Sequence, residues 1–142
     1  MIIFGTESGN AEMAADDVAA TFSERGFETK VISMEDVSVA NLALMANVVV
    51  ITSTYGEGEL PETTAPFIEA LQQSTPDLSA LNFAAFGLGD STYKKYNNAI
   101  DVVVNHLVDL GARQVGVTGR HDAASGISVT TVATEWAKAT YI

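Results

Sequence analysis

Apolar residues follow two different spacings along the chain, and the two spacings alternate. Short apolar runs predict five strands. These strands cover residues 2–4, 27–33, 48–51, 82–86 and 114–118. After each strand, apolar residues three or four positions apart predict a helix. These helices cover residues 11–22, 39–45, 63–73, 100–107 and 129–136.

Five strand–helix units predict an α/β fold, a doubly wound parallel sheet of five strands with helices on both faces. No repeat, low-complexity tract or linker interrupts the 142 residues, so we expect a single domain over residues 1–142. In such sheets, ligands bind beyond the carboxyl ends of the strands, where the strand order reverses. The loops after the first, third and fourth strands are therefore predicted to form the site.

The composition is that of an ordinary globular protein, with 47% hydrophobic and 18% charged residues. No apolar stretch approaches the roughly 20 residues of a membrane span, and the opening MIIFGTESGN lacks the basic start of a signal peptide. The absence of cysteine excludes disulfides and thiolate metal sites. We therefore expect a cytoplasmic protein without a membrane segment.

The charge balance is strongly acidic. Seven basic residues stand against eighteen acidic ones, which gives a formal net charge of −11. This charge argues against binding to nucleic acid or to an anionic membrane surface, because both require a cationic footprint. Two interpretations remain open: the acidity provides solubility, or it steers a basic partner to the protein.

The loop after the first predicted strand has the composition of a phosphate site. The sequence GTESGNAE, residues 5–12, combines the hydroxyls of Thr6 and Ser8 with Gly9 and a helix start. Amide groups at a helix N-terminus and small hydroxyl side chains form a neutral cradle for a phosphate. The alternative is a simple helix N-cap by Ser8 or Asn10. The loop matches neither the P-loop nor the GxGxxG pattern.

Tyrosines distinguish the loops after the third and fourth predicted strands. Tyr55 lies in TSTYGEGELPE, residues 52–62, and Tyr93 and Tyr96 lie in GLGDSTYKKYNNA, residues 87–99. Aromatic rings beside a phosphate cradle can sandwich a flat heterocycle. Ordinary packing at a helix start is the alternative for Tyr96. These loops therefore predict a site for a phosphorylated, planar ligand.

All three loops resemble the FMN-binding loops of flavodoxins and of the FMN domains of diflavin reductases. The resemblance covers essentially the whole chain, and the length is that of a short-chain flavodoxin. The stretches PDLSALNFAAFGLGDSTYKKYNNAID and GRHDAASG are similar to small bacterial flavodoxins of the MioC and cindoxin type. The resemblance implies the flavodoxin-like strand order 2-1-3-4-5 and FMN as cofactor.

The resemblance also implies roles for individual residues. The FMN phosphate would be surrounded by Thr6, Glu7, Ser8, Gly9, Asn10 and Ala11. One side of the isoalloxazine would be bordered by Ser53, Thr54, Tyr55, Gly56 and Gly58. Tyr93 would stack on the other face, and the ring edge and ribityl chain would contact Leu88, Gly89, Asp90, Tyr96 and Asn97. Asp122, after the fifth strand, matches an acidic residue near the flavin of diflavin FMN domains.

The sequence departs from the family pattern at two places. Asn10 and Ala11 stand where many flavodoxins have a final threonine in the phosphate loop. The basic pair Lys94 and Lys95 lies beside Tyr93 in an otherwise acidic rim, and its role is open. The histidines suggest no catalytic triad or metal site: we expect His106 on the surface and leave open a role for His121 near the flavin.

The resemblance implies an electron-transfer protein and not an enzyme with its own substrate. An NAD(P)H-dependent flavodoxin reductase would be the donor, the acceptor would be a redox enzyme such as a haem monooxygenase, and the carrier would act as a monomer. The alternative is an FMN-dependent enzyme of the quinone-reductase type, for which the chain has no spare segment to form a substrate pocket. A phosphoacceptor signalling domain would need paired carboxylates after the first strand, where Gly5 and Thr6 stand instead.

Overall fold

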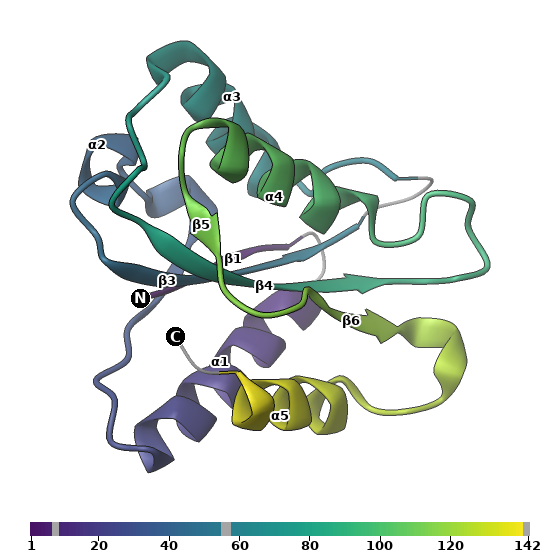
Figure 1. Cartoon of the computed structure of the whole chain (residues 1–142). Coiled ribbons are helices and arrows are strands. Elements are labelled where there is room, and N and C mark those ends of the chain that lie inside the picture. Colours follow the sequence, from purple (N-terminus) through teal and green to yellow (C-terminus); the bar gives the residue numbers. More distant parts are fainter. Residues whose placement is uncertain (7–8, 55–57, 141–142) are drawn as a thin grey trace.

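The protein forms a layer of parallel strands between two layers of helices, as the computed structural model in Figure 1 shows. The structure describes residues 1–6, 9–54 and 58–140. The helices are α1 (Asn10–Glu24), α2 (Val39–Leu42), α3 (Thr64–Ser74), α4 (Asn98–Asp109) and α5 (Val129–Ala139), with short 3-10 helices η1 (Met34–Asp36) and η2 (Ala123–Ser125). The strands are β1 (Ile2–Gly5), β2 (Val31–Ser33), β3 (Asn47–Ser53), β4 (Asn82–Gly89), β5 (Arg113–Gln114) and β6 (Gly119–Asp122).

The strand order is β2-β1-β3-β4-β5, and every pairing is parallel. This confirms the predicted fold class and strand order. The helices α1 and α5 cover one face of the sheet, and α2, α3 and α4 lie on the other (Figure 1). The sixth strand, β6, also pairs with β4 and lies beyond β5 along the same edge.

Alternating side chains of the central strand enter two separate cores. Val48 and Val50 of β3 pack with residues such as Phe67 and Leu107 under α3 and α4. Val49 and Ile51 belong to the opposite core, under α1 and α5. Both faces are therefore buried, which explains why the sequence of β3 is a continuous apolar run and not an alternating one.

The predicted fifth strand, residues 114–118, is wrong in its bounds. Arg113 and Gln114 pair with the start of β4, and residues 119–122 pair with its end. Only two residues of β4, Ala84 and Ala85, lie between these pairings, whereas four residues, 115–118, lie between β5 and β6. The two extra residues form a bulge at the sheet edge, where Val117 is 85% exposed.

Two other elements are shorter than the sequence pattern predicts. The second strand begins at Val31 and not at Phe27, which is 45% exposed. The helix predicted at residues 39–45 ends at Leu42.

Within the described residues, no helix is both long enough and apolar enough to cross a membrane.

Candidate functional site

The pairing of the strands brings the predicted loops to one edge of the sheet. At the carboxyl ends, Gly5 of β1 lies opposite Thr52 of β3, and Ser53 of β3 lies opposite Leu88 of β4. Asp122 of β6 pairs with Gly89 of β4. The segments that follow β1, β3, β4 and β6 therefore begin side by side.

The loop between β1 and α1 presents neutral hydrogen-bond donors. Thr6 directly follows β1, and its Oγ1 accepts a hydrogen bond from the Gly9 amide at 2.8 Å. Gly9 occupies the N-cap position of α1 with φ 93°, a left-handed conformation that favours glycine. The first-turn amides of α1 have no acceptor within the helix. An anion at this loop would meet backbone and hydroxyl donors.

The structure separates the predicted residues of this loop by role. Asn10 is the first helical residue and is exposed, so it is not the N-cap of α1. The side chain of Ala11 is fully buried in the core, which leaves only its backbone amide for the loop. Glu7 and Ser8 lie outside the described residues. Because Gly9 is the N-cap residue, the alternative N-cap by Ser8 or Asn10 is wrong.

The loop after β3 is joined to the end of β4 and the start of α4. The Thr54 amide donates to the Leu88 carbonyl at 2.9 Å, and the Thr54 hydroxyl accepts from the Ala99 amide at 3.0 Å. At the far end, the Gly58 carbonyl accepts from the Asn98 side chain at 2.8 Å. Tyr55 and Gly56 lie between these contacts and outside the described residues.

Lys95, whose role the sequence left open, packs against the end of the loop after β3. Gly58 has φ 115°, and a Cβ at this position would lie 2.6 Å from the Cβ of Lys95. The aliphatic part of Lys95 therefore packs directly on the Gly58 backbone. Ser53 and Thr54 are half-buried beside this segment.

The loop after β4 is a compact turn held by Asp90. The Asp90 Oδ1 accepts hydrogen bonds from the Thr92 amide at 2.9 Å and from the Thr92 hydroxyl at 2.7 Å. The Tyr93 amide donates to the Asp90 carbonyl at 3.1 Å. Tyr93 itself is 47% exposed, so its ring has a free face. Leu88 is buried below the turn.

Asn97 lies buried between the turn and the start of α4. It is fully buried with φ 58°, and its Nδ2 lies 3.5 Å from the His121 carbonyl. Its Oδ1 is buried without a hydrogen-bond partner in the described part of the chain. A Cβ on Gly87 would lie 2.5 Å from this oxygen, and a Cβ on Gly89 would lie 2.8 Å from the Asn97 amide nitrogen. The two glycines therefore make room for Asn97 at the end of β4.

Asp122 connects the end of β6 to the same turn. It is the last residue of β6, not part of the following loop, and its Oδ1 accepts from the amides of Ser91 at 3.0 Å and Ala124 at 2.9 Å. The hydrogen bonds from Ser91 lower the pKa of the Asp122 carboxyl. Burial, and then the Asp122 charge, raise the pKa of the half-buried Tyr96 phenol. The phenol therefore stays protonated at neutral pH.

The side chain of His121 makes a structural contact. His121 is 6% exposed, and its Nε2 lies 2.7 Å from the Ile127 carbonyl. Because a carbonyl only accepts, this nitrogen is the protonated one. His106 lies on α4, where the sequence places it, and is half-buried.

Sequence reasoning missed two threonines that support the site. The Thr63 hydroxyl, just before α3, accepts from the Thr6 amide at 2.8 Å and donates to the Thr6 carbonyl at 3.2 Å. The Thr64 hydroxyl is fully buried and lies 2.8 Å from that of Thr52. Two adjacent hydroxyls at a helix start were the available signal, but the partner of Thr63 is 57 residues away.

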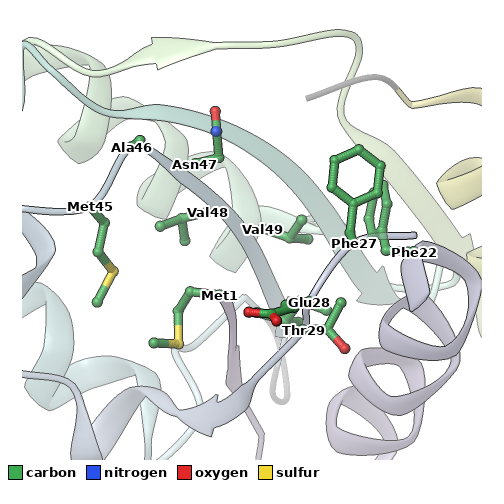
Figure 2. A pocket seen from close by; sticks show the side chains of 11 residues that line it. Met1, Phe22, Phe27, Glu28, Thr29, Met45, Ala46, Asn47, Val48 and Val49 are labelled. Atoms are coloured by element: carbon green, nitrogen blue, oxygen red, sulfur yellow. The ribbon is translucent and has the colours of Figure 1, made fainter. Parts of the chain in front are cut away.

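A cavity lies at the opposite, amino end of the strands. It has a volume of about 400 Å³ and lies between Met1, the start of β3 and residues 27–29 (Figure 2). The rings of Phe22 and Phe27 meet edge to face at one side of it, with Met45 at the other. None of the predicted site residues that the structure describes lines this cavity.

Comparisons with known proteins show which family the chain belongs to. The family model described as Flavodoxin matches residues 2–132. Protein MioC of Escherichia coli O157:H7 is 39% identical over 120 residues, which cover 82% of this chain and 78% of MioC. NADPH-dependent diflavin oxidoreductase 1 of Yarrowia lipolytica is 37% identical over 139 residues, 95% of this chain but 20% of that much longer protein.

Solved structures show the same fold. A point mutant of flavodoxin from Pseudomonas aeruginosa superposes with a TM-score of 0.87 at 29% identity, over 97% of this chain and 93% of the other. Oxidised flavodoxin 1 from Bacillus cereus superposes with a TM-score of 0.83 at 27% identity, over 96% and 92% of the two chains. The chain therefore belongs to the flavodoxin family, and its cofactor is FMN.

Proposed function

We propose that this chain binds FMN at the carboxyl edge of its sheet and passes single electrons from a separate reductase to an acceptor enzyme. The phosphate would lie in the loop of residues 6–11, and the isoalloxazine would lie between the loops after β3 and β4. The observation that supports this proposal is the convergence of these loops, two of which are joined through Thr54 and Ala99.

The donors of the first loop fit a phosphate monoester. The Thr6 hydroxyl oxygen already accepts from the Gly9 amide, so its own proton is left to donate to a ligand. The N-terminal amides of α1 add aligned dipoles, which favour negative charge at this end of the helix. Donors without formal charge can therefore bind the phosphate even though the loop contains no lysine or arginine.

The other two loops fit a flat ring. The exposed half of Tyr93 offers an aromatic face, and the contacts of Thr54 and Gly58 fix the backbone on both sides of Tyr55. Tyr96 offers a neutral phenol that can donate a hydrogen bond to a ring or ribityl oxygen. The roles of Tyr55 and Gly56 in this arrangement remain part of the proposal.

FMN supplies the one-electron chemistry when it is bound, and the protein supplies binding, orientation and electrostatics. Asp90 and Asp122 fix the turn that contains Tyr93, because their carboxylates accept hydrogen bonds from the backbone amides of Thr92 and Ser91. The net charge of −11 disfavours added negative charge on the bound ring and attracts a basic partner surface.

We also propose the partners. An NAD(P)H-dependent flavodoxin reductase fits as the donor, since several of the relatives carry NADPH in their names. Among them are the diflavin oxidoreductase above and a sulfite reductase flavoprotein component of Thiocapsa roseopersicina. A redox enzyme such as a haem monooxygenase fits as the acceptor, and the carrier would act as a monomer in the cytoplasm.

Titration of the apoprotein with FMN tests the proposal. Binding should quench flavin fluorescence, and the flavin absorption band should stay with the protein when free FMN is removed. The loaded protein should transfer electrons from NADPH and a flavodoxin reductase to cytochrome c. Tyr93→Ala should weaken FMN binding by about 0.5–1.5 kcal/mol through lost stacking alone, and more through lost apolar contact.

Tyr93→Phe is the matched control, because it keeps the ring and should keep the affinity. Failure of the wild-type apoprotein to bind FMN would contradict the proposal. Turnover of a quinone by the loaded protein with NADPH and no reductase would instead support the quinone-reductase alternative.

A further inference from the structure

We infer that Thr63 is a positioning residue that gives the site its preference for a phosphorylated flavin. Thr63 lies at the start of α3, outside the predicted phosphate loop. Its hydroxyl nevertheless makes hydrogen bonds to both backbone polar groups of Thr6. This inference rests on the proposed binding of the FMN phosphate at residues 6–11.

The geometry shows that one hydroxyl fixes one peptide unit on each side of Thr6. The Thr63 Oγ1 accepts from the Thr6 amide at 2.8 Å and donates to the Thr6 carbonyl at 3.2 Å. Both bonds are partly buried, so water cannot fully replace them. Thr6 is thereby fixed directly after β1, and its side chain is directed into the loop toward the Gly9 amide.

Thr63 makes these bonds in place of the usual role of a threonine at its position. It is the N-cap residue of α3, and an N-cap hydroxyl ordinarily accepts from the amide of the second or third helical residue. Here the second residue, Ala65, donates to the Pro61 carbonyl at 3.0 Å. The third is Pro66, which has no amide hydrogen.

The two prolines therefore leave the Thr63 hydroxyl without a capping partner in its own helix. The hydroxyl makes no side-chain cap bond and bonds to Thr6 across the sheet edge instead. Its neighbour Thr64 holds the start of α3 in place, because its buried hydroxyl pairs with that of Thr52 at 2.8 Å. The start of α3 is thus a fixed support for the phosphate loop.

The consequence concerns the phosphate alone. The Thr6 hydroxyl oxygen accepts from the Gly9 amide, which leaves its proton to donate to a phosphate, and the bonds from Thr63 hold the Thr6 backbone in place for this contact. The ring loops are held separately, by Thr54 and Asn98 at the start of α4. Loss of the Thr63 hydroxyl should therefore weaken binding of the phosphate and leave binding of the ring system unchanged.

The test compares FMN with riboflavin, which has the same ring and lacks the phosphate. Apoprotein of wild type, Thr63→Val and Thr63→Ser is titrated with each flavin by fluorescence quenching. Thr63→Val should lose about tenfold in affinity for FMN and less than about twofold for riboflavin. Thr63→Ser keeps the hydroxyl and should retain the wild-type ratio of the two affinities.

Thr21→Val is the matched control. It removes a buried hydroxyl of the same kind, one that donates to the Asp17 carbonyl at 3.0 Å within α1, and it should leave both affinities unchanged. An equal loss of FMN and riboflavin affinity in Thr63→Val, or no loss of either, would overturn the inference. Wild-type protein that binds FMN no better than riboflavin would instead overturn the proposed phosphate site.

A second measurement needs no variant and covers the case in which Thr63→Val does not fold. In wild-type apoprotein the Thr6 amide, already bonded to Thr63, should exchange its hydrogen slowly with and without inorganic phosphate. The amides of residues 10–12 should be protected only when phosphate is added. A Thr6 amide that exchanges as fast as an exposed one would count against the role of Thr63.

Discussion

At the scale of single residues, the site is built from short polar side chains that bond to backbone. Thr6, Thr63 and Asp122 each use a side-chain oxygen to accept from an amide of the loops, and Thr54 accepts from the Ala99 amide in the first turn of α4. None of these contacts involves a formal positive charge. The loops are therefore held in shape by neutral donors and carboxylate acceptors, which leaves the edge acidic.

Asp122 gives a prediction about pH at this scale. The hydrogen bonds from Ser91 lower its pKa in the folded protein, so it contributes stability above the ordinary carboxyl pKa of about 3.9. This contribution is lost as the pH falls through the lowered pKa. In an NMR titration, the amide shifts of Ser91 and Ala124 should therefore change with a midpoint below about 3.9.

Asp122→Asn is the control for this titration. It keeps an acceptor oxygen for both amides but cannot titrate, so the midpoint should vanish while the loop stays ordered. Amide shifts of Ser91 and Ala124 that change only above the ordinary carboxyl pKa would show that the hydrogen bonds do not stabilise the charged form.

At the scale of elements, the structure differs most from the sequence prediction at the β5–β6 edge of the sheet. The bulge between β5 and β6 contains Gly116 with φ 72°, and the indole of Trp136 donates to the Val117 carbonyl at 3.2 Å. After the bulge, Gly119 is the first residue that pairs with β4 again, and it packs against the rings of Phe86 and Trp136. A Cβ at Gly119 would lie 2.5 Å from atoms of Phe86 and Trp136.

Gly119→Ala should therefore destabilise the protein by about 1–3 kcal/mol, because the added methyl group must displace packed rings. Urea unfolding measures this change as a shift of the denaturation midpoint, provided that the dependence of the unfolding free energy on urea concentration is unchanged. Val117→Ala lies in the same bulge, but its side chain is 85% exposed, so it should change stability by less than about 0.5 kcal/mol. Equal effects of the two substitutions would show that Gly119 is not constrained by packing.

At the scale of the whole molecule, the charge of −11 acts on partners and not on the fold. The acidic residues near the site include the exposed Glu59 and Glu62, which follow the loop after β3, and the half-buried Asp90 in the loop after β4. Charged surfaces of opposite sign raise the rate of diffusional encounter. The acidic character of the molecule should therefore appear in kinetics more than in stability.

Electron transfer from the FMN-loaded protein to a basic acceptor such as cytochrome c should slow as salt rises. Screening shortens the range of the attraction to about 8 Å at 0.15 M ionic strength and about 3 Å at 1 M. Stopped-flow measurement between these conditions checks the prediction. A rate that stays constant with salt would leave solubility as the interpretation of the acidic composition.

The sequence by itself determined the order of the elements, the two-sided burial of the sheet and the edge at which the predicted loops lie. These properties follow from hydrophobic periodicity, which is local, and from the rule that parallel strands end at a common edge. The apolar run of β3 indicated burial on both faces, and the glycines and tyrosines after β3 and β4 indicated which loops form the site.

Only the tertiary structure decided the division of the last strand and the support of the loops. The division depends on the pairing of residues 113–122 with β4, and the short pattern RQVGV fits a continuous strand equally well. The bond from Thr63 to Thr6 joins residues 57 positions apart, and the packing of Lys95 on Gly58 depends on where α4 begins. A local pattern contains no information on such partners, because register and long-range hydrogen bonds are fixed only when the helices pack against the sheet.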